Sequence, residues 1–249
     1  MVRSITPSIG ILTIPTKYGG VILQLYVDWF KHKGVNIIPI PYDTIEHEKY
    51  FNMIHGLLIP GSSHGDNQII SKNDIMIRCI SRFIILSLRE YFPILGICYG
   101  FQLLVCAISG ITKLTIHHAD GLYPIHICNH SRMFSTFSPS FLHSLENSNS
   151  TLHNNNFGIS VIDFMKNKHL TRFYNIVATG TDDNHKQYVS VIEAKYYPIY
   201  GIQWHPERST NTAGPIADFF ISECRVRSRK YNTKCIHDKD IKNQVCYYF

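Results

Sequence analysis

The first half of the chain alternates short apolar runs with amphipathic segments. Apolar runs bounded by Gly and Pro predict strands, and apolar residues at helical spacing predict helices. The predicted strands are residues 8–14, 36–40, 54–59 and 92–97, and the predicted helices are residues 21–32 and 75–88. Strands separated by helices are joined by right-handed crossovers, so this pattern predicts a parallel sheet covered by helices on both faces.

The second half has a different pattern, which predicts a more antiparallel region. Its apolar runs, with polar turns between them, are residues 159–164, 174–179, 188–194 and 199–204. Residues 144–156 are mostly polar and predict a loop, whereas residues 213–225 predict a closing helix. We therefore expect an α/β fold. It would be a three-layer sandwich with a mostly parallel central sheet, helices on both faces and a more antiparallel C-terminal half.

The composition indicates a single domain. A chain of 249 residues with 45% hydrophobic residues can bury one sizeable core. We expect one domain over residues 1–225 and a basic, flexible tail over residues 226–249. The net charge of +6 falls mainly at that end, because residues 225–242 hold seven Lys and Arg against two Asp. This charge therefore indicates a solvated tail, with a weak anchor for an acidic partner as the alternative, and not a nucleic-acid-binding domain.

The same features indicate the cellular compartment. No apolar run approaches the length of a membrane span, and the first residues lack the apolar segment of a signal peptide. The seven cysteines are an odd number without the spacing of a disulfide framework, which is typical of a reducing compartment. We expect a cytoplasmic protein that binds neither membranes nor nucleic acids.

The most informative motif surrounds Cys98. The segment Phe92–Gln102 predicts a buried strand, a tight turn and a helix, with Cys98 between Gly96 and Gly100. This is the spacing of a nucleophile elbow, and the helix N-terminus behind it favours a thiolate. Cys98 is therefore the candidate nucleophile for acyl transfer through a thioester. The alternative for Cys98 is a buried structural cysteine. Cys106, which has no elbow around it, is interpreted as such a core residue.

A second motif, Trp-His-Pro-Glu, supplies a base. His205 can take a proton from the nucleophile, and Glu207 can accept the other ring N–H because in extended backbone the two side chains point the same way. For the oxyanion, we expect one backbone N–H from Tyr99 and another from the Pro-Gly-Ser turn, at Gly61 or Ser62. Neither His-x-Glu nor Pro-Gly-Ser is informative alone. Their combination with the elbow carries the prediction.

These motifs resemble those of the class I glutamine amidotransferase superfamily. Within it, residues 9–220 are similar to the gamma-glutamyl hydrolases. Further segments with this similarity are residues 18–20 (Tyr-Gly-Gly), 130–134 (His-Ser-Arg-Met-Phe), 156–160 (Asn-Phe-Gly-Ile-Ser) and 196–201 (Tyr-Tyr-Pro-Ile-Tyr-Gly). The resemblance implies cleavage of γ-glutamyl amide bonds, with folylpoly-γ-glutamate as the small-molecule substrate and Cys98, His205 and Glu207 as the triad. It also implies a homodimer as one possibility, and members are often secreted, lysosomal or vacuolar.

The resemblance suggests substrate contacts as well. Arg132 and Lys17 are the candidate cations by resemblance and position, and Tyr18 is a further candidate contact. Gln102 is a candidate for the pocket wall or for support of the nucleophile turn. Related chains usually have a substrate-binding histidine where this chain has Asn155, and His153 lies two residues earlier. Either His153 takes that role or the substrate is held differently. The connection after Glu207 is also shorter than in related chains, which leaves the preferred substrate length open.

Parts of the sequence also fit other functions. His117 and His118 invite a metal interpretation, but adjacent side chains point to opposite sides of a strand. Thiol catalysis needs no metal or other cofactor, so we expect none. A glutaminase subunit that passes ammonia to a synthase is an alternative favoured by Gln102. A non-catalytic binding module is a further alternative, which the intact Cys98–His205–Glu207 set argues against.

Overall fold

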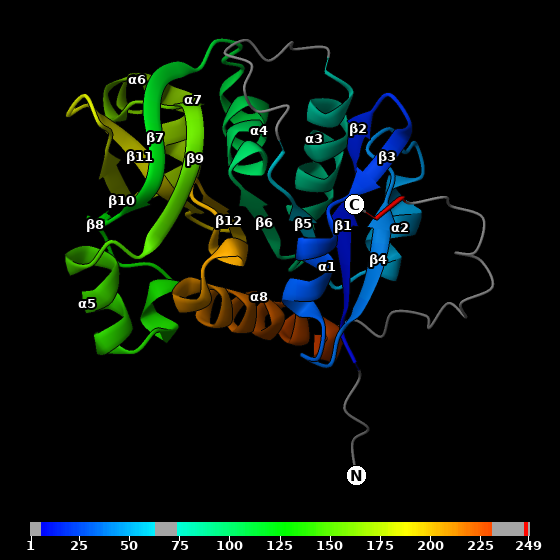
Figure 1. Ribbon diagram of the computed structural model, residues 1–249. Coiled ribbons are helices and arrows are strands. Elements are labelled where there is room, and N and C mark those ends of the chain that lie inside the picture. Colours follow the sequence, from blue (N-terminus) through cyan, green and yellow to red (C-terminus); the bar gives the residue numbers. More distant parts are fainter. Residues whose placement is uncertain (1–5, 63–73, 231–246, 249) are drawn as a thin grey trace.

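The computed structural model describes residues 6–62, 74–230 and 247–248. Its centre is an eight-stranded sheet with helices on both faces (Figure 1). In spatial order the strands are β4 (Asn36–Ile40), β1 (Ser8–Leu12), β5 (Gly56–Ile59), β6 (Ile94–Ile97), β12 (Ile199–Ile202), β11 (Gln187–Ala194), β10 (Tyr174–Thr181) and β8 (His126–Ile127). The first five of these strands pair in parallel, and the last three pair antiparallel. The predicted sandwich with a mixed sheet is confirmed.

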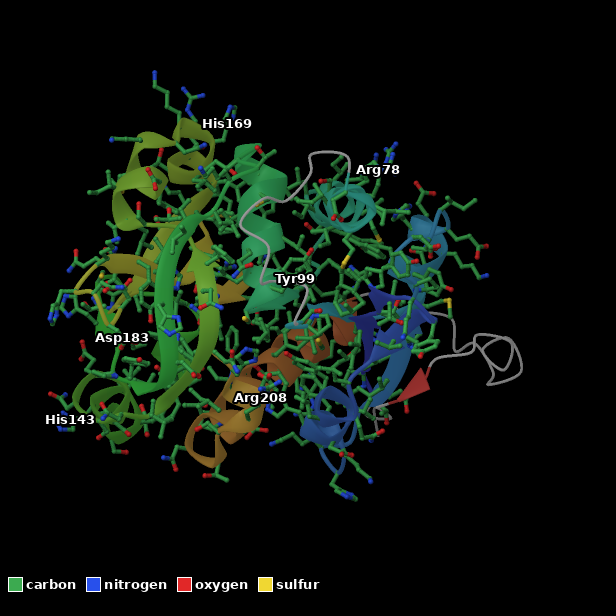
Figure 2. The ribbon with its side chains drawn as sticks, turned by 45° about the horizontal axis from the view of Figure 1, so that its top comes forward. Arg78, Tyr99, His143, His169, Asp183 and Arg208 are labelled. Carbon is green, nitrogen blue, oxygen red and sulfur yellow. The ribbon has the colours of Figure 1, made fainter. Side chains whose placement is uncertain are left out.

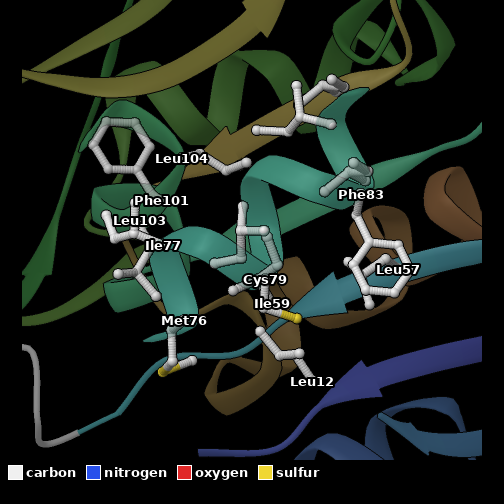
Figure 3. Close-up of a cluster of buried hydrophobic side chains, with 14 of the residues drawn as sticks. Leu12, Leu57, Ile59, Met76, Ile77, Cys79, Phe83, Phe101, Leu103 and Leu104 are labelled. Atoms are coloured by element: carbon white, nitrogen blue, oxygen red, sulfur yellow. The ribbon is translucent and has the colours of Figure 1, made fainter. Parts of the chain in front are cut away.

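Two hydrophobic clusters fill the space between the sheet and the helices. One face is covered by α2 (His47–Met53), α3 (Ile75–Ser87), α4 (Tyr99–Ser109), α6 (Val161–Lys166) and α7 (Lys168–Phe173). The other face is covered by α1 (Gln24–Phe30), α5 (Pro139–Asn147) and α8 (Thr210–Lys230). Figure 3 shows part of the first cluster, where Phe83 of α3 lies beside Leu57 of β5, and Phe101 lies with Leu103 and Leu104 of α4. This packing places the ends of β5, β6 and β12 at one edge, as the sequence predicted.

Two segments differ from the predicted elements near the start of a helix. The helix predicted from residue 21 begins at Gln24, because Gly19–Ile22 forms β3 and pairs with β2 (Ile14–Thr16) in a small second sheet. The last strand, β13 (Tyr247–Tyr248), adds to this sheet beside β3. Residues 159–164, predicted as a strand, are mostly helix α6. Ser160 caps that helix by accepting the Asp163 N–H, which is a local signal of a helix start.

The polar segment 144–156 is not a loop. Its first part ends α5, and Thr151–Gly158 forms β9, which pairs antiparallel with β7 (Thr115–Tyr123). The inward positions of β9 are polar instead of apolar: Thr151, His153 and Asn155 are all buried. They hydrogen-bond along one face of the strand, so the usual apolar alternation of a strand is missing from the sequence.

The predicted boundary of the tail at residue 225 is also corrected. Helix α8 continues to Lys230, and Arg227 is buried with its guanidinium over the rings of Phe51 and Phe92. The guanidinium donates to the carbonyl oxygens of Phe51 and Tyr91. A cation in this position belongs to the domain. Residues 231–246 and residue 249 of the predicted tail lie outside the described residues.

Candidate active site

Cys98 lies at the apex of a sharp turn between β6 and α4. Its backbone has φ 50° and ψ −102°, a left-handed conformation that is strained for a residue with a side chain. The neighbouring glycines are required by close packing. A Cβ on Gly96 would lie 2.6 Å from the Gly100 oxygen, and a Cβ on Gly100 would overlap the carbonyl oxygen of Ile59 in β5. The elbow therefore presents the thiol at the end of the central strands, at the first turn of α4.

His205 is brought to the same place by the chain that leaves β12. Its backbone N–H donates to the Leu152 carbonyl oxygen over 2.8 Å, which fixes the strand end against β9. Residues Pro206–Arg208 then form a 3₁₀ turn, so His205 and Glu207 do not lie in the extended backbone that the sequence suggested. The turn still joins them: the Glu207 Oε1 is 2.7 Å from the His205 Nδ1. Both side chains are buried.

The electrostatic surroundings of His205 favour its protonated form. Burial alone would lower its pKa, but the negative charge of Cys98, a hydrogen bond with that sulfur and the Glu207 carboxylate raise the pKa to about 10. These surroundings keep His205 protonated, so it can serve as a proton donor at the Cys98 cavity.

Tyr26 of α1 is a further residue of this site, and no sequence motif pointed to it. Its hydroxyl accepts the Gly61 N–H over 2.7 Å. Burial raises its pKa well above the ordinary value, and the nearby charges of Glu207 and Cys98 raise it further. Among the described residues, the second carboxylate oxygen, Glu207 Oε2, is buried without a hydrogen-bond partner. The hydroxyl stays protonated and binds the turn at Gly61 near the carboxylate.

This contact changes one predicted oxyanion donor. The Gly61 N–H points to the Tyr26 hydroxyl, so in this structure it is engaged and is not directed at the substrate position. Tyr99 is the first residue of α4, where the helix supplies no intrahelical acceptor for the N–H. Ser62 lines the pocket next to Cys98. The assignment of the Tyr99 and Ser62 amides as oxyanion donors therefore stays a prediction.

A cavity of about 380 Å³ opens at the Cys98 side chain. It is lined by Leu23, Gly61, Ser62, Cys98, Asn154, His205 and Arg208. Asn154 and Arg208 were missed from the sequence, although both had a signal. Asn154 lies between the two residues singled out on its strand and so points to the opposite side, and Arg208 directly follows Glu207. Figure 2 labels Arg208, at the turn before α8, together with Tyr99, at the start of α4.

His153 and Asn155, the two candidates for the family's histidine, point away from this cavity. They form a buried chain in which Thr151 Oγ1 is 3.0 Å from the His153 Nε2, and Asn155 bonds the ring of His117. Burial lowers the pKa of His153 to about 3 and that of His117 to about 4, so both rings are neutral. This chain holds β9 in place and turns Asn154 toward the cavity.

The other predicted substrate contacts also have different neighbours. Gln102 is buried and its amide donates to the Phe157 carbonyl oxygen over 2.7 Å, which ties the elbow helix to β9. Arg132 pairs with Glu193 at 3.0 Å and donates to two backbone carbonyls, and it is not among the cavity-lining residues. Tyr18 lies in the β2–β3 turn and is 66% exposed. Gln102 and Arg132 are therefore structural in this arrangement.

Other features of the described residues do not form part of the site. A larger cavity, of about 600 Å³, lies beside α6 and contains neither Cys98 nor His205. His117 and His118 face opposite sides of β7, one buried and one bonded to Asn156, and no cluster of three metal-ligating side chains occurs in residues 6–62 and 74–230. None of the helices described is both long and apolar enough to cross a bilayer.

Comparisons with known proteins identify this arrangement. The model of the family Glutamine amidotransferase class-I matches residues 18–222. The chain is 31% identical to the gamma-glutamyl hydrolase of Bos taurus, over 84% of this chain and 72% of that protein. It is 30% identical to the gamma-glutamyl hydrolase of Homo sapiens, over 94% of this chain and 82% of that protein. The chain belongs to the gamma-glutamyl hydrolase family.

The fold is shared more widely. The glutaminase domain of Trypanosoma brucei CTPS, solved with bound acivicin, superposes with a TM-score of 0.62 at 15% identity, covering 93% of this chain and 98% of that one. At this identity the similarity concerns the fold only. The gamma-glutamyl hydrolases of Bos taurus and Homo sapiens, in contrast, match in sequence over 84% and 94% of this chain. The family resemblance inferred from the motifs is thus confirmed.

Proposed function

We propose that this protein is a cysteine hydrolase that cleaves γ-glutamyl amide bonds, with Cys98 as nucleophile. The observation that carries the proposal is the shared cavity of Cys98 and His205, with His205 held by Glu207 at 2.7 Å. A strained elbow, an imidazole and a buried carboxylate at one sheet edge serve acyl transfer. Membership of the gamma-glutamyl hydrolase family supports the choice of bond.

The groups present can carry out both halves of the reaction. The Cys98 thiolate attacks the γ-carbonyl carbon, and the oxygen becomes an oxyanion beside the Tyr99 and Ser62 amides. His205, as imidazolium, gives its proton to the amine as the C–N bond breaks, which leaves a thioester. A water molecule then attacks the thioester while His205 takes its proton, the C–S bond breaks and the thiolate–imidazolium pair returns. The released acid loses its proton to solvent.

We propose folylpoly-γ-glutamate as the substrate class. This narrower assignment rests on the family resemblance and on the cavity. A γ-linked glutamate chain presents one α-carboxylate per residue, and the cavity beside Cys98 is lined by the cation Arg208. The glutaminase alternative loses the feature that favoured it, because Gln102 bonds the backbone of β9 instead of facing the cavity.

The test is turnover of two substrates by the purified protein. Pteroylpentaglutamate and free glutamine are incubated separately, and glutamate, shortened folates and ammonia are measured. We expect glutamate chains to be released from the pteroyl substrate and little ammonia from glutamine. Cys98→Ala should abolish the release while circular dichroism shows an unchanged fold. Turnover of glutamine alone, or activity retained by Cys98→Ala, would contradict the proposal.

A further inference from the structure

The cavity at Cys98 carries a cation whose role the thiol chemistry does not explain. Arg208 lines the cavity, and it is the only Lys or Arg among the described residues that do so. Its side chain is 41% exposed, so it can meet a ligand that enters from solvent. The reaction itself needs a thiolate, a proton carrier and oxyanion donors. A guanidinium beside the nucleophile is therefore free to serve in recognition.

A hydrogen bond fixes the backbone of Arg208, whereas its guanidinium makes only one distant ion pair. Its N–H donates to the His205 carbonyl oxygen over 3.2 Å, inside the 3₁₀ turn that begins at Pro206, whose ring restricts the backbone. The Nε lies 3.8 Å from the Glu207 Oε1, beyond hydrogen-bond distance. A guanidinium has five N–H donors in a planar fork. No other ion pair of Arg208 occurs among the described residues, so the fork can meet a carboxylate in the cavity.

The substrate places a carboxylate within reach of that fork. In a γ-glutamyl group the scissile carbonyl carbon and the α-carboxylate carbon are separated by four C–C bonds of about 1.5 Å each, an extended span of about 5 Å. A carbonyl at Cys98 therefore keeps its α-carboxylate inside the same cavity. Asn154 faces the cavity from β9 and offers an amide N–H₂, because the buried chain of Thr151, His153 and Asn155 holds the opposite face of the strand.

We propose that Arg208 binds the α-carboxylate of the γ-glutamyl group that acylates Cys98, with Asn154 as a second donor. The inference rests on the proposed function and specifies its substrate contact. Arg208 is thus a specificity-determining residue, which selects acyl groups that carry a carboxylate at this distance. Its effect differs from that of a residue acting through Glu207, because a carboxylate partner matters only for substrates that have a carboxylate.

The experiment compares three p-nitroanilides that differ at one carbon. The γ-glutamyl compound has both the α-carboxylate and the α-amine, the glutaryl compound keeps only the carboxylate, and the 4-aminobutyryl compound keeps only the amine. For Arg208→Gln we expect KM to rise about 10- to 100-fold for the first two compounds, since a charge-assisted hydrogen bond contributes about 1.5–3 kcal/mol. For the 4-aminobutyryl compound KM should not change. Arg208→Lys should restore part of the loss.

Two controls separate the outcomes. Arg132→Gln removes a cation that pairs with Glu193 outside the cavity, and it should leave all three KM values unchanged. Calorimetric binding of the γ-glutamyl compound to Cys98→Ala, with and without Arg208→Gln, needs no turnover. If the wild type cleaves none of the compounds, the proposed function fails, and binding still decides the role of Arg208. An equal loss of kcat for all three compounds, or equal binding with and without Arg208→Gln, would overturn the inference.

Discussion

The Gly61 amide donates to the Tyr26 hydroxyl over 2.7 Å, and this bond joins the turn after β5 to helix α1 beside the nucleophile. Tyr26→Phe removes the acceptor and leaves a buried N–H unpaired. We expect the free energy of unfolding to fall by about 1–3 kcal/mol. Because the turn that carries Ser62 is then less well held, kcat should fall about 10-fold with little change in KM. Urea unfolding and steady-state kinetics measure both.

Tyr174 offers a matched control for this change. Its hydroxyl is also buried, but it has no hydrogen-bond partner among the described residues, and it lies in the core under α6 and α7. Tyr174→Phe should therefore be neutral or slightly stabilising and should leave kcat unchanged. Equal losses in Tyr26→Phe and Tyr174→Phe would mean that the Gly61 bond has no role of its own.

The raised pKa of His205 predicts an alkaline limit to activity. The imidazolium that protonates the leaving amine is lost as the pH rises through about 10, so kcat/KM should fall there. Glu207→Gln removes a charge that raises this pKa, and the limit should move to lower pH by about 1–3 units. The measurement is kcat/KM from pH 6 to pH 11. Glu146→Gln, which changes an exposed glutamate near His126, should leave the profile in place.

The same shift has a consequence for stability. Folding raises the pKa of His205, so protonated His205 adds to the free energy of unfolding. This contribution is fully present below the unfolded pKa of 6.5 and is lost as the pH rises through about 10. Because the Cys98 charge is a leading cause of the increase, Cys98→Ala should lower the pKa of His205. Titration of the ring by NMR in that variant decides the point. An unchanged pKa would show that the sulfur carries no charge in the pair.

Close packing at the elbow predicts the effect of one added methyl group. Gly100→Ala would direct its Cβ at the Ile59 carbonyl oxygen, a backbone atom that cannot move without shifting β5. We expect a loss of about 3 kcal/mol or more in the free energy of unfolding, although alanine has the better helix propensity. In the same helix, Ala107→Gly should cost only about 1 kcal/mol. A small effect of Gly100→Ala would contradict the role given to this glycine.

The sequence predicted the parts of the fold that have strong local patterns. The parallel strands are apolar runs bounded by Gly and Pro, and the elbow has glycines at defined spacing, so both could be located. Strand β9 could not, because its inward residues are polar and satisfy one another through hydrogen bonds that depend on β7. Residues 159–164 have the apolar content of a strand, but the Ser160 side chain caps a helix that begins at Val161.

In the candidate site, too, some residues could be predicted from motifs, whereas others depend on tertiary contacts. Cys98, His205 and Glu207 belong to motifs, and their spacing along the chain could be interpreted directly. Tyr26 could not be found in this way, since its role depends on the meeting of α1 with the turn after β5. Arg132 was chosen for its charge, but that charge is paired with Glu193. The cation in the cavity is instead Arg208, whose place follows from the 3₁₀ turn after His205.

Arg227 lies in a basic segment of the sequence but is a residue of the core. Its guanidinium is 1% exposed, lies over the rings of Phe51 and Phe92, and is 3.3 Å from the Glu90 carboxylate. Arg227→Ala leaves buried carbonyl oxygens and a carboxylate without their partner, so the free energy of unfolding should fall by about 3–5 kcal/mol. Arg229→Ala, two residues further at an exposed position, should change it by less than about 0.5 kcal/mol. Urea unfolding of the two variants distinguishes a core cation from a solvated one, and equal stabilities would place the end of the domain before residue 227.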